Sequence, residues 1–339
     1  RELAQIKGIR LIVGNSEKFT LIEQLGDLQH SNSRILTNDN RSIFTTRGFI
    51  RVQDGCSNFC SYCIVPLVRG AEKSVPVATV LNEVRQRVND GYQEVVLTGT
   101  EIGSYSYDNL KLMGLLERIL AETEVRRLRL SSLQPQEISP ELIALWHNKR
   151  LCRHFHLSLQ SGSDEVLGRM NRRYSLQDYQ KSVDLIREAI PEVAITTDII
   201  VGFPGETEAE FVQSYEFCKK MRFARIHVFS YSARQGTRAA EMPDQVDDRV
   251  KKARSRKMLD LAKTSAKDFC QRFLGSTATV LFEQQSNGVW SGLTDNYIKV
   301  YARSSQDLTN RLTPVKIIRI RQDGVWGEVE IPVNAGPIV

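Results

Sequence analysis

Three cysteines lie within eight residues in the stretch Gln53-Asp54-Gly55-Cys56-Ser57-Asn58-Phe59-Cys60-Ser61-Tyr62-Cys63. The stretch directly follows a predicted strand, and α/β folds place their sites at the carboxyl ends of strands. Three thiolates on one short loop can hold a single metal centre. Structural zinc usually takes a fourth ligand from a second close pair, which the sequence lacks. The set suits a four-iron cluster with one open iron, with zinc or three incidental core residues as alternatives.

Working outward from this loop, strand-like runs alternate with helical patterns. Helical spacing is clear in Val77–Val88 and around Leu112–Leu120, and capping signals begin helices at Ser139, Ser175 and Thr207. Six βα units between residue 48 and about 245 predict a parallel sheet, either open or closed into a barrel. The predicted strands are Phe49–Gln53, Glu94–Leu97, Arg127–Ser131, His154–Leu159, Ala194–Val201 and Ala224–Ser230.

The two ends of the chain differ from this α/β region. Residues 1–47 hold a short βα pattern, with a strand over 9–14, and a polar linker. A long charged helix is predicted over 247–274. Five short strands with Asn-Gly, Asp-Asn and Asp-Gly turns follow in 275–339 and predict a small all-β barrel. The predicted strands are Ala278–Phe282, Val289–Thr294, Tyr297–Val300, Val315–Ile320 and Val325–Ile331. The main α/β domain therefore spans 48–246.

The composition excludes several classes of protein. The 339 residues are 41% hydrophobic and 25% charged, which is ordinary for a globular chain. No apolar run approaches the ~18 residues of a membrane helix, and no secretory segment leads the chain. We therefore expect a cytoplasmic protein that does not bind membranes, without a disulfide framework. The net charge of +6 is compatible with a nucleic-acid partner but does not require one.

Other candidate residues lie on or after later strands. Gln160, Ser161 and Ser163 could bind a ribose or cap the next helix, and Ser163 is the expected cap. Arg172 suits phosphate or carboxylate binding, or is part of a solvated basic turn. Asp198 lies inside an apolar strand and needs a partner, which is either a ligand or a structural network.

The Cys-x3-Cys-x2-Cys spacing, with Tyr62 before the third cysteine, resembles that of the radical S-adenosylmethionine (SAM) enzymes, whose partial (β/α)6 barrel the six βα units also fit. The resemblance implies that the cysteines ligate a [4Fe–4S] cluster whose open iron chelates SAM. Reduction of this cluster splits SAM into methionine and a 5′-deoxyadenosyl radical. At 98–101, Thr-Gly-Thr-Glu stands for a Gly-Gly-Glu-like motif, with a plain turn as the alternative. The implied ligands are Cys56, Cys60 and Cys63, and the implied SAM-binding residues are Tyr62, Gly99, Thr100, Glu101, Ser132, Gln160, Ser161, Arg172, Asp198, Gly202 and Phe203.

Several stretches narrow the resemblance to the methylthiotransferases. They are Phe49–Cys56, Cys63–Gly70, His156–Ser163 with 169–174, and Thr197–Thr207, while the terminal barrel resembles the RNA-binding TRAM domain. Residues 129–135 resemble the Ser-Ser-Leu-Glu-Pro segment of the branch acting on N6-threonylcarbamoyladenosine in tRNA, with Gln134 in place of Glu. The implied reaction is methylthiolation of C2 of the adenosine beside the anticodon, at position 37. Alternatives are N6-isopentenyladenosine, a ribosomal-protein aspartate and, outside enzymes, a zinc-stapled RNA-binding protein.

The family also implies components beyond this chain. Full members carry an N-terminal domain whose three further cysteines hold a second [4Fe–4S] cluster, the proposed sulfur donor or carrier. No cysteine precedes Cys56 and the chain begins at Arg1. We therefore expect this chain to lack that cluster's ligands, to cleave SAM, and to need the missing domain for sulfur insertion.

Implied partners are the tRNA anticodon stem-loop, an electron donor such as flavodoxin or ferredoxin, and a sulfur donor, and we expect a monomer. Cations of the barrel are expected to meet phosphates, or to form only an ordinary exposed face; they are Lys299, Arg303, Arg311, Lys316, Arg319 and Arg321.

Overall fold

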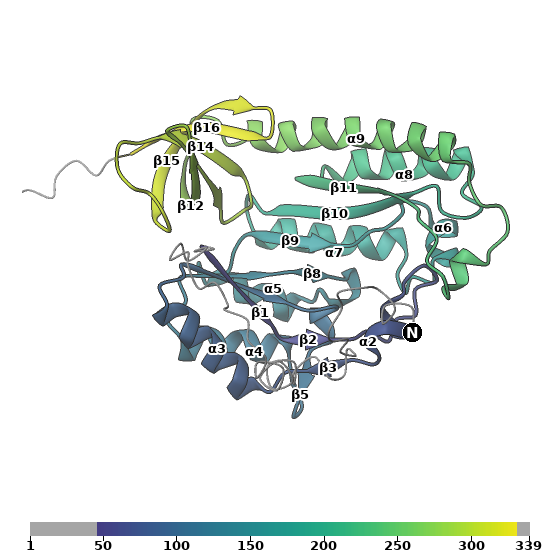
Figure 1. Ribbon diagram of the computed structural model, residues 1–339, viewed down its shortest axis with the longest axis horizontal. Helices are drawn as coiled ribbons and strands as arrows, with labels where there is room; N and C mark the ends of the chain where they lie inside the picture. Colours follow the sequence, from purple (N-terminus) through teal and green to yellow (C-terminus); the bar gives the residue numbers. More distant parts are fainter. Residues whose placement is uncertain (1–45, 331–339) are drawn as a thin grey trace, which may run out of the picture.

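Parallel strands form the centre of the larger domain in the computed structural model, which describes residues 46–330 (Figure 1). The strands form two groups, ordered β1-β4-β7 and β11-β10-β9-β8, with every neighbouring pair parallel. Together they make the predicted partial barrel. The bounds are β1 (Arg47–Arg51), β4 (Glu94–Thr98), β7 (Arg127–Leu130), β8 (Ser132–Leu133), β9 (His154–Leu157), β10 (Ala194–Val201) and β11 (Arg225–Ser230).

The predicted third strand is divided at Ser131. The backbone N–H of Ser131 still donates to Leu97 O at 3.0 Å, on the β4 side. The next residue, Ser132, already pairs with His156 of β9. One continuous segment therefore serves both groups of strands, and the sheet turns at this point.

The strands have an apolar outer face and a polar inner face, as side-chain alternation requires. In β10, Ile195, Ile199 and Val201 belong to the main hydrophobic core. Thr196 and Asp198 point the other way, toward the inside of the partial barrel. We call the inward surface of the strands the inner face; it includes Glu94, Arg129, His154, His156 and Asp198.

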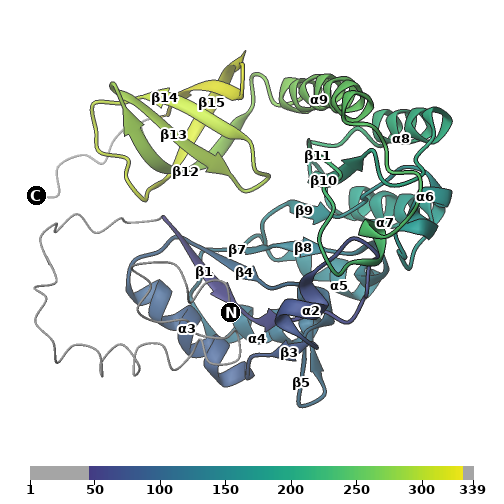
Figure 2. The same cartoon turned by 45° about the vertical axis from the view of Figure 1, so that its right-hand side comes forward.

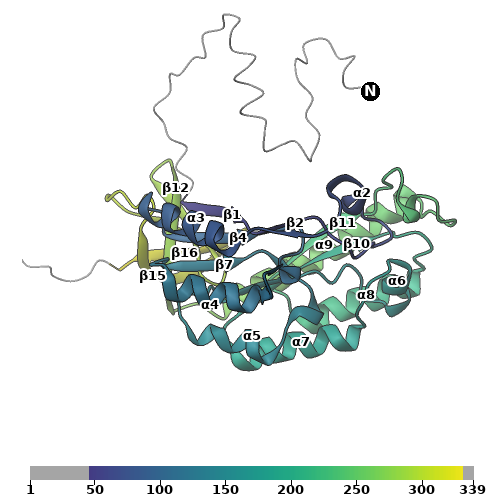
Figure 3. The same ribbon diagram turned by 90° about the horizontal axis from the view of Figure 1, so that it is seen from below.

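Helices cover the outer face, and Figure 3 shows α4, α5, α7 and α8 along one side of the strands. Their apolar stripes, such as Leu112, Leu115, Leu116 and Ile119 on α4, are buried. Ser139, Ser175 and Thr207 cap helices as predicted. The bounds are α2 (Val65–Arg69), α3 (Val77–Asn89), α4 (Leu112–Glu122), α5 (Pro140–Ala144), α6 (Asp164–Arg169), α7 (Leu176–Ala189) and α8 (Glu208–Met221), with short pairs β2 (Gln53–Asp54) and β3 (Lys73–Ser74), and β5 (Ser106–Tyr107) and β6 (Leu110–Lys111).

The connecting helix α9 (Asp248–Gln271) runs from the α/β domain to the small barrel (Figure 1). The barrel is closed in the order β12-β13-β14-β16-β15, which confirms the predicted all-β domain. One predicted strand, Tyr297–Val300, begins two residues late. Tyr297 has a positive φ of 67° in the turn that precedes it, which ends the extended conformation there. The bounds are β12 (Thr277–Ser286), β13 (Val289–Thr294), β14 (Lys299–Arg303), β15 (Leu312–Arg321) and β16 (Gly324–Val329).

The small barrel packs against the amino ends of the parallel strands (Figure 2). Arg129 forms a buried ion pair with Glu94 at 2.7 Å and also donates to the carbonyl of Asp295 at 3.0 Å. Tyr297 stacks on His154, with ring centroids 4.5 Å apart. These contacts cover the amino ends of β4, β7 and β9 on the inner face.

Two further predictions concern the first residues of the chain and membrane-spanning helices. The expected strand over 9–14 and its α/β remnant lie outside the described residues. Among residues 46–330, every helix is too short or too polar to cross a membrane.

Candidate active site

The cysteine loop lies at the carboxyl end of β1, opposite to the small barrel. Gly55 enters it with a φ of +76°, and an added Cβ would lie 2.1 Å from the carbonyl oxygen of Ala71. The N–H of Cys56 donates to Gly70 O at 3.2 Å, and that of Cys63 to Cys60 O at 3.0 Å. The loop is therefore a tight backbone structure that needs glycine at its start.

All three cysteines of the loop are free thiols with partly exposed side chains. Burial, and then a hydrogen bond to Glu101, raise the pKa of Cys56 to about 12. Burial also raises the pKa of Cys63. Protonated thiols are the stable form without a metal, and ligation must release their protons.

Polar side chains connect two of the thiols around one side of the loop. The Sγ of Cys56 lies 3.0 Å from Glu101 Oε2, and the amide of Gln134 donates to the other Glu101 oxygen. Arg172 then donates to Gln134 Oε1 at 2.9 Å and to the Sγ of Cys60 at 3.2 Å. A carboxylate and a guanidinium thus lie beside the thiols, where they can bind an ammonium and a carboxylate respectively.

The donor set fits a cluster better than a single cation. Among the described residues, one group could hold a lone ion near the loop, formed by Cys56, Glu72 and Glu101. That ion would leave the thiols of Cys60 and Cys63 unused. A [4Fe–4S] cluster uses three thiolates and leaves one iron for a ligand.

Several predicted SAM-binding residues lie with the cysteine loop or on the inner face. Glu101 is held by Gln53, whose Oε1 accepts from its N–H at 2.9 Å. Thr100 donates to Asp54 at 3.3 Å. Asp198 lies 3.2 Å from His156 Nε2, which supplies the partner that its burial demands. Ser132 lies across from the same histidine.

Other predicted residues have buried side chains. Ser161 is fully buried, and its hydroxyl hydrogen-bonds Ser214 of α8 at 3.1 Å. Phe203 is also fully buried and packs edge-to-face with Tyr62 at 6.4 Å. At both positions we expect support of the site rather than side-chain contact with a ligand.

The strand-end turns leave mainly backbone groups for ligand contact. Gly202 has a φ of +71°, and its N–H donates to Glu206 Oε2 at 2.6 Å. Gln160 has a φ of +68°, and its backbone bridges to β10. Gly99 packs tightly, because an added Cβ would lie 2.8 Å from Ile102. Ser163 precedes α6 as predicted, but its hydroxyl donates to Glu165 at 2.7 Å instead of capping the backbone.

Sequence reasoning did not identify three polar residues beside the loop. Asn58 and Gln134 both donate to Glu101. Burial, and then the nearby carboxylate of Glu101, raise the pKa of Glu137 to about 8. The available signal was the clustering of amide and acidic residues over 134–137, directly after a short strand.

A partial parallel barrel with three free thiols at the end of its first strand defines a radical SAM enzyme. The family profile of the Radical SAM superfamily matches residues 50–218. Coproporphyrinogen III oxidase from Escherichia coli, a radical SAM enzyme, superposes on 85% of this chain and 72% of its own, with a TM-score of 0.48 and 12% identity.

Curated relatives define the family more narrowly. Threonylcarbamoyladenosine tRNA methylthiotransferase MtaB of Bacillus subtilis is 33% identical over 94% of this chain and 75% of its own length. The tRNA-2-methylthio-N(6)-dimethylallyladenosine synthase of Caldicellulosiruptor saccharolyticus is 38% identical over 83% of this chain and 61% of its own.

The chain belongs to the radical SAM methylthiotransferases. It is an enzyme of that class, with a [4Fe–4S] cluster and SAM as cofactors. The non-enzymatic zinc interpretation is therefore wrong.

Proposed function

We propose that this enzyme methylthiolates C2 of N6-threonylcarbamoyladenosine beside the anticodon of tRNA. One observation carries the proposal: three free thiols, a carboxylate and a guanidinium converge at one end of an inner face, and a small β-barrel packs at its other end. The relative from Bacillus subtilis, which covers 94% of the chain, bears the name of this activity.

The residues divide into ligands and SAM-positioning groups. Cys56, Cys60 and Cys63 hold the cluster, which when bound supplies the electron that splits SAM into methionine and a 5′-deoxyadenosyl radical. Glu101, oriented by donors from Asn58 and Gln134, accepts from the ammonium group of SAM. Arg172 binds its carboxylate.

Other groups position the rest of the cofactor. The backbone at Gly202 approaches the adenine, since its positive φ leaves no side chain in the way. Tyr62 rests on the buried ring of Phe203 and is thereby fixed beside the thiols. Ser132, Gln160 and Asp198 offer polar groups along the inner face. All these residues lie within 48–246, the α/β domain predicted from the sequence; the predicted connecting helix follows up to 274.

The proposed partners follow from the small barrel and from the chemistry of the reaction. Cations of the barrel meet RNA phosphates, so RNA binding falls steeply with salt. The enzyme also needs an electron donor, such as flavodoxin or ferredoxin, and a sulfur donor. It acts as a monomer in the cytoplasm.

A second candidate substrate, dimethylallyladenosine, is chemically similar to the proposed one. The relative from Caldicellulosiruptor saccharolyticus is named for dimethylallyladenosine and has the higher identity, 38%. The two substrates differ in the N6 substituent, which is charged in the threonylcarbamoyl case and apolar in the other.

The decisive test is anaerobic reconstitution with iron and sulfide, followed by iron counting and an absorption spectrum. We expect about four irons per chain, lost when Cys56, Cys60 and Cys63 are replaced by Ala and retained in the matched variant Cys218→Ala, whose thiol is buried in the core. SAM cleavage is then measured with anticodon stem-loops that carry either substituent. Stimulation by the threonylcarbamoyl RNA alone supports the proposal, and stimulation by the dimethylallyl RNA alone contradicts it.

A further inference from the structure

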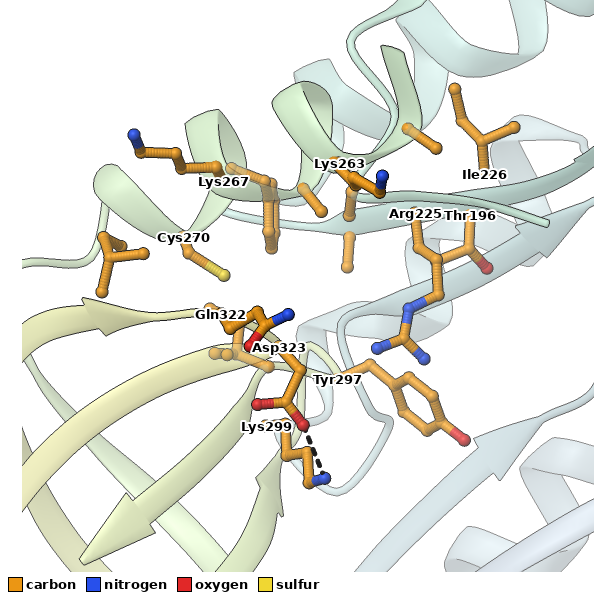
Figure 4. A pocket seen from close by; sticks show the side chains of 18 of the residues that line it. Thr196, Arg225, Ile226, Lys263, Lys267, Cys270, Tyr297, Lys299, Gln322 and Asp323 are labelled. Atoms are coloured by element: carbon orange, nitrogen blue, oxygen red, sulfur yellow. Dashed lines mark hydrogen bonds and ion pairs between the residues drawn. The ribbon is translucent and has the colours of Figure 1, made fainter. Parts of the chain in front are cut away.

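A pocket lies where the α/β domain, α9 and the small barrel meet (Figure 4). Its volume is about 770 Å³, which is within the range of sites that take a nucleoside-sized group. The first residues of β10 and β11 form one wall, the second half of α9 another, and the turn at 320–324 a third. None of the SAM-positioning groups described above lines it.

The pocket has an excess of positive charge. Five cations line it, and one carboxylate, Asp323, which already binds Lys299 at 3.0 Å. Among residues 46–330, no carboxylate lies within ion-pair distance of Arg225. Figure 4 shows its guanidinium projecting from β11 toward Tyr297. The cations are Arg225, Lys263, Lys267, Lys299 and Arg321.

The same pocket continues the inner face that begins at the cysteine loop. Arg225 pairs in register with Thr196, which pairs with His156, so the three side chains form one row. The next row toward the loop holds His227 and Asp198. Asp198 lies 3.2 Å from His156 Nε2, and among residues 46–330 no ion pair joins it to Arg225.

The distance between loop and pocket suits a substrate base. Thr196 lies five residues before the end of β10, or about 16 Å along the strand. A cofactor held beside the loop would leave part of that length for a purine. In the proposed substrate, C2 and the N6 substituent flank N1 on the same edge of the base, and the substituent extends beyond that edge and ends in a carboxylate.

We propose that Arg225 binds the carboxylate of the N6-threonylcarbamoyl group and so selects this substrate over the apolar dimethylallyl one. This inference rests on the proposed function. The apolar side chains of Ala262, Ala266 and Phe269 line the same pocket and can contact the aliphatic part of the substituent. A dimethylallyl group offers no anion to the guanidinium, so that substrate would gain no charge-assisted hydrogen bond at this position.

The test compares equilibrium binding of three synthetic anticodon stem-loops that differ only at the target adenosine: threonylcarbamoyl, dimethylallyl and unmodified. Reconstituted protein with SAM is used, at one fixed salt concentration. The wild type should bind the threonylcarbamoyl RNA about 10- to 100-fold more tightly than the unmodified RNA, as expected for one charge-assisted hydrogen bond. Arg225→Gln should remove this preference and leave affinity for unmodified RNA unchanged.

Two variants complete the design. Arg225→Lys retains the charge and should restore part of the preference, whereas a merely structural role would not be rescued selectively. Lys149→Gln removes one exposed charge outside the pocket and should keep the wild-type ratio.

The outcomes separate the two proposals. If Arg225→Gln weakens all three RNAs equally, Arg225 contacts a backbone phosphate and the inference is overturned. If the variant keeps the preference, Arg225 is not the selector. If the wild type itself shows no preference for the threonylcarbamoyl RNA but prefers the dimethylallyl RNA, the proposed function fails first.

Discussion

Replacing Arg129 by Met should destabilise the metal-free protein by about 3–5 kcal/mol, because it leaves the carboxylate of Glu94 buried without a partner. The two side chains are 2% and 1% exposed, so water cannot replace the lost guanidinium. Arg129 makes two hydrogen bonds to Glu94 and two more to carbonyls of the small barrel, at Thr294 and Asp295. We therefore expect a value near the upper end of the range.

The matched control is Arg153→Met, which breaks an ion pair with Asp295 at the same domain interface. That pair is 34% and 23% exposed, so its loss should cost only about 1 kcal/mol. A third variant, Glu94→Leu with Arg129→Met, removes both buried charges. It should be more stable than Arg129→Met alone, since the unpaired carboxylate is gone.

The assay is urea unfolding followed by circular dichroism and by tryptophan fluorescence. Trp290 and Trp326 report on the small barrel and Trp146 on the α/β domain, so loss of interdomain contact appears as separated transitions. The reasoning is refuted if Arg129→Met costs no more than Arg153→Met, or if the double variant is no more stable than Arg129→Met.

Three further predictions concern glycines and one carboxyl group. Gly55→Ala should abolish iron loading, because its Cβ would lie 2.1 Å from a carbonyl oxygen. Gly168→Ala has open space around its Cβ and should load normally. Equal iron loading of the two variants would contradict the tight loop. Gly292→Ala places a Cβ 2.2 Å from the carbonyl of Leu281 and should lower the melting temperature of the small barrel by several degrees, which calorimetry can check; an unchanged barrel transition would argue against this packing. The raised pKa of Glu137, about 8, means that the folded state holds its proton more tightly than the unfolded state, so its contribution to stability is present below about pH 4.5 and is lost as the pH rises toward 8. Glu137→Gln should flatten the melting temperature of the metal-free protein over that pH interval, and an unaltered slope would assign the dependence to other groups.

Much of the fold followed from local patterns. The run Ala194–Val201 is apolar and β-branched, and it forms β10 with the predicted bounds. The five strands of the small barrel followed from turn residues between short runs. Such features depend only on residues that are neighbours in sequence, so they can be recognised without knowledge of the tertiary structure.

Pairing between distant segments could not be predicted in the same way. The division at Ser131 depends on Leu97 and His156, which lie far away in sequence. The parallel pairing of β14 with β16 inside the small barrel is also non-local. The late start of β14 reflects the left-handed conformation of Tyr297, for which the sequence pattern gives no signal.

The candidate site likewise combines features that are local in sequence with contacts between distant segments. The spacing of Cys56, Cys60 and Cys63 is local, and the structure brings these thiols together on one loop. The contact of Gln134 with Glu101 requires two separate strand ends to meet, so sequence reasoning noted Gln134 only as a departure from a motif. The burial of Phe203 depends on packing against Tyr231, which no local pattern reveals.

The partial barrel of parallel strands is not closed, and this affects how readily copies of the protein could associate through their strands. Among the described residues, β1 pairs only with β4 and β11 only with β10, so each keeps one edge where another chain could add a strand. Arginines occupy these edge strands, at Arg47 and Arg51 on β1 and at Arg225 on β11. Charged side chains on an edge discourage intermolecular strand pairing. We therefore expect the arginines of these strands to keep the unclosed sheet from pairing with other chains.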